Sequence, residues 1–261
     1  MDMKLNGKHA LVCGASQGIG QASAEALAEL GARVTVVARS ADKLSAVASQ
    51  LDRINGEKNQ WIAVDLSNES EIEARLLPAL AKDPVQVLVL NAGGPPPGPL
   101  QSADPQAFID GMRPHLVASQ HLLRAALPGM REAGYGRIIN IISTSVYEPI
   151  PGLGVSNTVR AAVAAWAKTL VGELGPDGIT VNNVLPGFTA TSRLDKIIEG
   201  KARQQDMSDA EVAEQLRSFV PLRRFAQPEE VANAVAFLAS PAAAYISGVS
   251  LAVDGGRLKS L

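Results

Sequence analysis

The chain contains 261 residues, of which 46% are hydrophobic and 19% are charged. This composition excludes a disordered chain and is sufficient for the core of one α/β domain. The formal net charge is −2, so bulk charge gives no reason to expect a nucleic-acid partner. The single cysteine, Cys13, excludes an internal disulfide framework and a cysteine-based zinc cluster, and with three histidines we expect no metal site.

The sequence also lacks segments that direct a chain into a membrane. Its beginning, MDMKLNGKHA, contains no apolar stretch typical of a signal peptide. It contains no run of about 18 apolar residues, so we expect no transmembrane span and no membrane partner. These features predict a soluble, cytoplasmic protein.

Short apolar segments alternate along the chain with longer amphipathic ones. In chain order we expect a strand at 10–13, a helix at 19–30, a strand at 33–38, a helix at 42–54, a strand at 61–64, a helix at 69–80, a strand at 85–90, a helix at 105–131, a strand at 137–142, a helix at 155–174, a strand at 180–185, a helix at 228–238 and a strand at 250–253. Most strands are continuously apolar, as strands buried on both faces are. The alternation predicts an α/β fold with a single Rossmann-type, doubly wound parallel sheet of about seven strands and helices on both faces.

No linker or repeat divides the chain, so we expect one domain over residues 1–261. A polar segment at about 188–220 interrupts the alternation, and we expect it to form a lid with short helices at 194–201 and 209–219. Its basic residues, among them Arg193 and Lys196, are interleaved with acidic ones, which favours a solvated amphipathic lid. The proline-rich segment 93–99 predicts a stiff loop opposite the lid.

Three glycines follow the first expected strand and open the first expected helix. Gly14, Gly18 and Gly20 have the spacing GxxxGxG. Glycines at such a turn let backbone N–H groups and the helix N-terminus approach a pyrophosphate without a clash with a Cβ atom. A purely structural turn is the alternative, but the position between a strand and a helix favours a dinucleotide site.

The end of the second expected strand bears on the choice of cofactor. In dinucleotide-binding folds, a carboxylate about 20 residues past the glycines binds the ribose hydroxyls of NAD. This region instead offers Arg39 and Ser40. Because an arginine can make charge-assisted hydrogen bonds to a 2′-phosphate, we predict NADP(H) as the cofactor. A solvated arginine at a strand end is the alternative.

With these features the chain resembles the short-chain dehydrogenase/reductase family over about residues 5–256, and most of all its 3-oxoacyl-carrier-protein reductase branch. The motifs that carry the resemblance are GASQGIG at 14–20, DL at 65–66, NAG at 91–93, PG at 186–187 and DGG at 254–256. The resemblance implies a cofactor site formed by Gly14, Ser16, Gln17, Gly18, Ile19, Gly20, Arg39, Ser40, Asp65, Leu66, Asn91, Ala92, Gly93, Arg160, Pro186, Gly187 and Thr191.

The resemblance also implies a catalytic tetrad of Asn, Ser, Tyr and Lys, the last two spaced as YxxxK. In the family, Tyr protonates the substrate oxygen as NADPH delivers hydride, Lys lowers the Tyr pKa and binds the nicotinamide ribose, and Ser holds the substrate oxygen. This sequence has no YxxxK, and its corresponding residues are His115, Ser143, Ser156 and Arg160. Only the serine, Ser143, is retained, so we predict a non-standard proton donor.

Two side chains are candidates for that donor. The imidazole of His115 titrates near about 6.5 when unperturbed, so it could act directly or through water. Tyr147, on the loop after the fifth strand, could supply a phenol from another backbone position. A polar helix residue and a pocket wall are the respective alternatives. Ser156 is expected to fill space or donate a hydrogen bond, and Arg160 to bind ribose and stabilise negative charge.

Three functions remain open at this point. The first is an NADP(H)-dependent oxidoreductase that reduces the carbonyl of a small molecule, such as a 3-oxoacyl thioester or another ketone. The second is an NADPH-binding sensor or assembly protein with little or no catalysis, which the missing Tyr and Lys suggest. The third is reduction of an activated C=C or C=N bond on the same fold.

The resemblance further implies that copies of the chain associate as a homotetramer or homodimer. The helices expected at 105–131 and 155–174 and the last strand would lie at the interfaces. A single-chain mass in light scattering would contradict this expectation.

Overall fold

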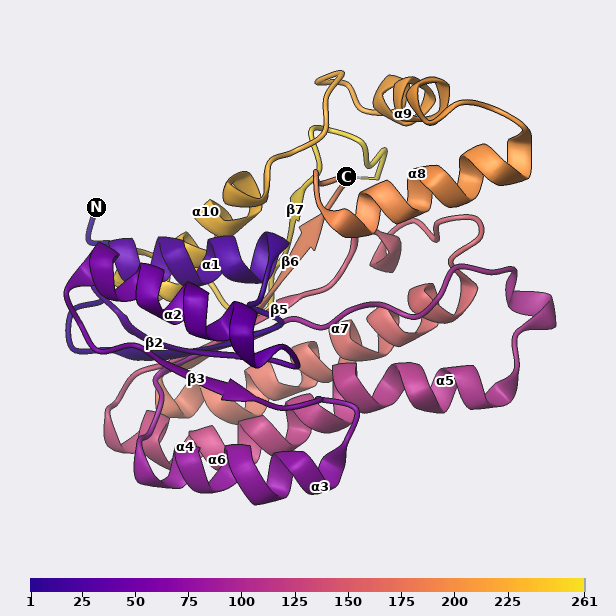
Figure 1. Cartoon of the computed structure of the whole chain (residues 1–261). Helices are drawn as coiled ribbons and strands as arrows, with labels where there is room; N and C mark the ends of the chain where they lie inside the picture. Colours follow the sequence, from indigo (N-terminus) through magenta and orange to yellow (C-terminus); the bar gives the residue numbers. More distant parts are fainter. Residues whose placement is uncertain (261) are drawn as a thin grey trace.

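Seven short apolar segments pair side by side into one sheet in the computed structural model, which describes residues 1–260 (Figure 1). The strands are β1 His9–Cys13, β2 Arg33–Ala38, β3 Gln60–Ala63, β4 Val87–Leu90, β5 Gly136–Ile141, β6 Ile179–Pro186 and β7 Ser250–Val253. They lie in the order β3-β2-β1-β4-β5-β6-β7, and every pairing is parallel. The predicted fold class is therefore confirmed. The chain direction across the sheet reverses between β1 and β4, where ligands of such folds bind.

Helices cover both faces of this sheet (Figure 1). One face carries α1 Gly18–Glu29, α2 Ala41–Asn55 and α10 Pro228–Ala239. The other carries α3 Glu69–Glu71, α4 Leu77–Lys82, α5 Pro105–Met112, α6 Ala118–Glu132 and α7 Gly154–Leu174. The lid consists of α8 Ser192–Gln205 and α9 Asp209–Ser218. Short 3₁₀ turns lie at Leu100–Ser102, Thr144–Val146, Gly175–Asp177 and Pro241–Ala243.

Two helices that the sequence predicts as continuous are interrupted by π-helical turns. The expected helix at 105–131 contains the π segment Arg113–Val117, and that at 69–80 contains Ile72–Leu76. Pro114 lies inside the first segment, and Pro78 is the second residue after the second segment. Because proline has no N–H and its ring crowds the preceding turn, it disfavours the regular α-helical hydrogen-bond pattern, although Pro128 lies within α6. The wider turns accommodate both prolines without ending either helical path.

Several helix ends follow from local sequence signals. Gly31, which follows the C-cap Leu30 of α1, has φ +91°, a conformation in which glycine commonly ends a helix. Pro228 opens α10, where Gln227 and Glu230 form a capping box. Ser40 occupies the N-cap position of α2, but its side chain makes no capping hydrogen bond.

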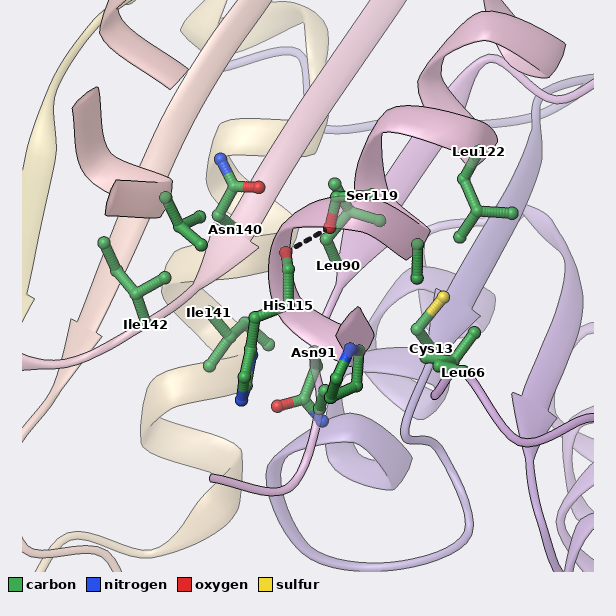
Figure 2. A pocket seen from close by; sticks show the side chains of 14 residues that line it. Cys13, Leu66, Leu90, Asn91, His115, Ser119, Leu122, Asn140, Ile141 and Ile142 are labelled. Atoms are coloured by element: carbon green, nitrogen blue, oxygen red, sulfur yellow. Dashed lines mark hydrogen bonds between the residues drawn. The ribbon is translucent and has the colours of Figure 1, made fainter. Parts of the chain in front are cut away.

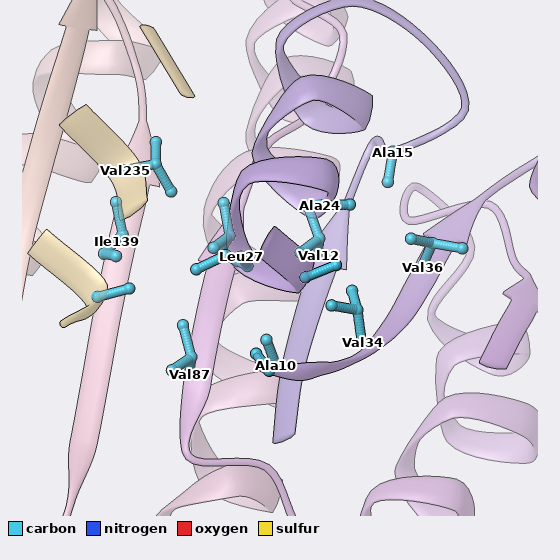
Figure 3. Packing of buried hydrophobic residues seen from close by; sticks show 14 of the residues in the cluster. Ala10, Val12, Ala15, Ala24, Leu27, Val34, Val36, Val87, Ile139 and Val235 are labelled. Carbon is cyan, nitrogen blue, oxygen red and sulfur yellow. The ribbon is translucent and has the colours of Figure 1, made fainter. Parts of the chain in front are cut away.

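Each face of the sheet has its own hydrophobic core. Figure 3 shows the first, in which Leu27 of α1 packs among Val12, Val34 and Val87 of the strands. These side chains are fully buried. The cores fix the strand ends relative to the helix N-termini, and thereby the edge at which the candidate site lies. Within residues 1–260, none of the helices has the length and hydrophobicity needed to cross a bilayer.

The lid has a small hydrophobic cluster of its own. Leu194 and Ile198 of α8 pack against Val212 and Leu216 of α9. Opposite the lid, the proline-rich loop is held to the segment before α7, because the amide of Gly98 donates to the Gly152 carbonyl at 2.7 Å. Both walls of the site are thus ordered by contacts within the chain.

Replacing Leu27 with Ala should lower the free energy of unfolding by about 2–5 kcal/mol, because it leaves a cavity in a fully packed core. Denaturant unfolding of the purified protein measures this change. The control variant Ile54→Ala, at the exposed end of α2, should change stability by less than about 1 kcal/mol. Equal losses in the two variants would contradict the assigned core.

Candidate active site

The glycine turn between β1 and α1 is closely packed against the end of β4. Gly14 and Gly18 have φ values of +62° and +59°, which side-chain-bearing residues rarely adopt. A Cβ on Gly14 would lie 2.7 Å from the Asn91 carbonyl oxygen, and one on Gly20 would collide with the Gly14 carbonyl. The turn therefore needs its glycines, and Asn91 Nδ2 donates to the Gly14 carbonyl at 3.4 Å.

The N-terminus of α1 is open to an anion. Its N-cap residue, Gln17, makes no side-chain capping hydrogen bond, and the first turn contains no acidic residue. Backbone N–H groups at such a helix end attract a pyrophosphate. Gln17 instead donates to Ser192 Oγ at 2.9 Å and accepts from Lys43 Nζ at 3.1 Å. The Thr191 methyl group lies close above Gly18, so the start of the lid covers the turn. These residues fit a dinucleotide.

The residues that follow β2 and β3 lie at the same edge of the sheet as the glycine turn. Arg39 and Ser40 are exposed there. Desolvation alone would raise the pKa of Asp65, but hydrogen bonds from the Ser67 amide and hydroxyl and the charge of Arg39 lower it overall. Arg39 thus lies close enough to Asp65 to affect its ionisation, and its guanidinium makes no ion pair within residues 1–260.

Three consecutive carbonyls after β4 accept hydrogen bonds from three basic side chains. Arg160 Nη2 donates to Ala92 at 3.4 Å, His115 Nε2 to Gly93 at 3.1 Å, and Arg193 Nη1 to Gly94 at 3.1 Å. The donors come from α7, from the π segment before α6 and from α8. The fold therefore brings the predicted residues His115 and Arg160 to the same loop, together with Arg193.

Arg160 is a buried charge that only backbone carbonyls satisfy. Its side chain lies in a residue that is 6% exposed, and Nη1 donates to the Ile141 carbonyl at 2.8 Å. Burial, with a contribution from the charge of Arg193, lowers the pKa of Arg160 to about 9. The guanidinium is thus still charged at neutral pH. Its Nε has no hydrogen-bond partner within the described chain.

His115 is buried beside Asn91 at the ends of the strands (Figure 2). Desolvation and the positive charges of Arg160 and Arg193 hold the pKa of His115 well below 6.5, although its bond to Gly93 acts in the opposite direction. The imidazole is therefore neutral at pH 7, with its Nε2 proton directed at Gly93. His115 also lines a cavity of about 10 Å³, which is large enough for one water molecule at most.

The remaining predicted side chains differ in their surroundings. Ser143 Oγ accepts from the Ser145 amide at 3.0 Å and is partly exposed, so its own proton is free for another acceptor. Ser156 is buried on the first turn of α7. Tyr147 is 52% exposed, and its hydroxyl points toward the Ser250 carbonyl of the edge strand β7, 3.5 Å away. As a proton donor Tyr147 stays a prediction, and within residues 1–260 no hydrogen bond joins it to Arg160 or His115.

Arg193 is the site residue that the sequence analysis missed, because it counted this arginine only as part of a solvated lid. The signal is its position two residues after Thr191, in the first turn of α8, where a long side chain can reach across to the β4 loop. Gly94 belongs with it, since a Cβ there would lie 2.5 Å from Arg193 Nη2. Within residues 1–260 there is no group of three or more His, Cys, Asp or Glu side chains that could hold a metal ion.

Comparison with known proteins identifies relatives over nearly the whole chain. Residues 14–257 match the protein family described as "Enoyl-(Acyl carrier protein) reductase". A 3-oxoacyl-[acyl-carrier-protein] reductase of Vibrio cholerae is 38% identical over 258 residues, covering 97% of this chain and 98% of that protein. The NADPH-dependent reductase BacG of Bacillus subtilis is 29% identical over 97% of this chain and 98% of its own.

Solved structures agree with this result. The L-sorbose reductase of Gluconobacter frateurii, crystallised with NADPH and L-sorbose, superposes with a TM-score of 0.94 at 32% sequence identity. The similarity covers 100% of each chain. The fold of this chain is thus that of its relatives.

Replacing His115 with Asn should make stability less dependent on pH. The native pKa lies below that of the unfolded chain, so the unfolded state takes up the proton first as the pH falls below about 6.5. For each unit by which the pH falls, protonation of this one group in the unfolded state lowers the free energy of unfolding by at most about 1.4 kcal/mol. His115→Asn lacks the imidazole, so its free energy of unfolding should not show this loss. Denaturant unfolding at pH 7 and pH 5, with His121→Asn as the matched variant, measures the difference. A slope in His115→Asn as steep as that of the wild type would contradict the buried neutral imidazole.

Proposed function

Because the chain belongs to the short-chain dehydrogenase/reductase family, we propose that it is an NADP(H)-dependent oxidoreductase that reduces a carbonyl group of a small molecule. The substrate class includes 3-oxoacyl thioesters and other ketones, in line with the names of several relatives. The observation that carries the proposal is an open helix N-terminus at the glycine turn, with an exposed Arg39 nearby that makes no ion pair within residues 1–260. Two relatives, BacG and the L-sorbose reductase, are described with NADPH.

Bound NADPH would supply the hydride for this reduction. The glycine turn and the α1 N-terminus would hold its pyrophosphate, and Arg39 with Ser40 its 2′-phosphate. Asp65 and Leu66 would lie at the adenine, and Arg160 at the nicotinamide ribose. The other residues proposed to line the cofactor site are Ser16, Gln17, Ile19, Asn91, Ala92, Gly93, Pro186, Gly187 and Thr191.

The substrate oxygen is proposed to bind Ser143. The Ser143 Oγ already accepts from the Ser145 amide, so the hydroxyl proton is directed outward and can be donated. Two of the five N–H groups of Arg160 are used by carbonyls, and its charge favours the negative charge that develops on that oxygen. Hydride addition to the carbonyl leaves an alkoxide on the substrate, and this alkoxide is about as strong a base as the alkoxide of a serine. The Ser143 hydroxyl can therefore give its proton to the substrate oxygen and recover a proton from solvent.

His115 is proposed to position the site rather than to supply the proton. Its imidazole is neutral, and its Nε2 proton is engaged by Gly93. By holding Gly93, it fixes the loop to which Arg160 is also bonded. Ser156 has no phenol to offer and is proposed to fill the space that the family tyrosine would occupy.

Replacing Arg39 with Ala should weaken NADPH binding by about 10- to 100-fold and leave NADH binding nearly unchanged. The physical reason is the loss of a charge-assisted hydrogen bond to the 2′-phosphate, worth about 1.5–3 kcal/mol. Fluorescence titration with each nucleotide measures both affinities. The control variant Arg53→Ala removes an exposed charge from the last turn of α2. If the wild type bound NADH as tightly as NADPH, the assignment of Arg39 would be wrong.

Replacing Ser143 with Ala should lower kcat by about 100-fold, as removal of one donor to a developing oxyanion does. The rate of NADPH oxidation with acetoacetyl-CoA and a panel of simple ketones measures the change. Ser145→Ala is the matched control, because Ser145 Oγ makes no hydrogen bond within residues 1–260. Equal rates in wild type and Ser143→Ala would remove Ser143 from the mechanism.

The presence of Ser156 at the tyrosine position also favours a second candidate, an NADPH-binding sensor or assembly protein with little catalysis. In that case the wild type would bind NADPH and oxidise it with none of these substrates. The double variant Ser156→Tyr, Arg160→Lys would then gain activity. Turnover by the wild type at ordinary enzymatic rates excludes this candidate.

A further inference from the structure

We infer that Arg193 is a specificity-determining residue that binds a carboxylate of the substrate, so that the preferred substrate is a small oxo acid. This inference rests on the proposed reductase function and narrows its substrate class.

The position of Arg193 is the first argument. Its side chain crosses from the lid helix α8 to the loop after β4, where Nη1 donates to Gly94. The two preceding carbonyls hold His115 and Arg160, which occupy tetrad positions. An anion bound by Arg193 would therefore lie close to the reacting carbonyl rather than at the distant end of a long thioester.

The charge of the site is the second argument. No ion pair within residues 1–260 involves Arg160 or Arg193. The charge of Arg193 lowers the pKa of Arg160, and both lower that of His115, while no carboxylate shifts any of the three pKa values. The free chain thus places the charges of the buried Arg160 and the exposed Arg193 near each other, with no carboxylate paired to either, and a bound anion would stabilise this arrangement.

The chemistry of the guanidinium is the third argument. Arginine presents a planar fork of N–H donors that matches a carboxylate, and one bond to Gly94 leaves most of these donors available. The bond to Gly94 holds the fork in place before substrate binds. A neutral ketone would use none of these features.

The experiment compares acids with their esters on the protein loaded with NADP⁺, so that no reduction occurs. The ligands are 2-oxobutanoate, acetoacetate and levulinate, which place the carboxylate at increasing distances from the carbonyl, and their ethyl esters. Saturation-transfer NMR titrations give the affinity of each for the wild type, Arg193→Gln and Arg203→Gln. Arg203 is the matched control, an exposed arginine near the end of the same helix.

We expect at least one acid to bind the wild type and Arg203→Gln about tenfold more tightly than its ester. Arg193→Gln should lose this preference and keep its affinity for NADP⁺ and for the ester within about twofold. The inference is overturned if no acid binds more tightly than its ester, or if the preference survives in Arg193→Gln. It is also overturned if Arg193→Gln weakens NADP⁺ binding instead, since Arg193 would then be a cofactor residue.

A second variant tests the position of the guanidinium with Arg193 still present. In Gly94→Ala the new Cβ would lie 2.5 Å from Arg193 Nη2, so the guanidinium must move. The same tenfold preference for the acid should fall, and retention of the full preference counts against the inference. If the wild type does not bind NADPH in the fluorescence titration, the reductase function is rejected independently of Arg193. The affinities for the acids and esters are then measured on the protein without nucleotide.

Discussion

The buried guanidinium of Arg160 is the interaction on which the rest of the candidate site depends. A full positive charge in the interior requires partners, and here they are the carbonyls of Ile141 and Ala92. These carbonyls lie at the ends of two neighbouring strands, so one side chain ties together the edge at which substrate and cofactor would meet. Together with the burial of the imidazole, the same charge also lowers the pKa of His115. Arg160 thus acts on both the architecture and the electrostatics of this edge.

Most of the fold could be predicted from the sequence, because apolar runs and amphipathic segments report burial directly. The parallel order also followed from their alternation. The π turns were not predicted, since Pro114 and Pro78 were not weighed as breaks within helices. In the site, the glycines, Asn91 and Arg160 could be placed because short motifs fix their spacing. Arg193 could not, because its role depends on a contact with Gly94, 99 residues away in the chain.

The lid and the cofactor turn are connected by side chains as well as by position. Gln17 bonds both Ser192, at the start of the lid, and Lys43 of α2. The first turn of the lid helix also places Arg193 over the β4 loop. One short segment, from Thr191 to Arg193, therefore contacts both the glycine turn and the loop after β4.

The loop after β4 presents only main-chain oxygens to its three basic partners. A main-chain acceptor survives any side-chain substitution, so the hydrogen bonds to Arg160, His115 and Arg193 are insensitive to the chemical identity of the residues that provide the oxygens. Of the two glycines that provide these oxygens, Gly93 has room for a Cβ atom, whereas a Cβ atom on Gly94 would meet Arg193. Mutation can therefore alter the cationic side of this contact one residue at a time, while the accepting side stays fixed. This asymmetry gives the fold a way to change what it recognises without rebuilding its backbone.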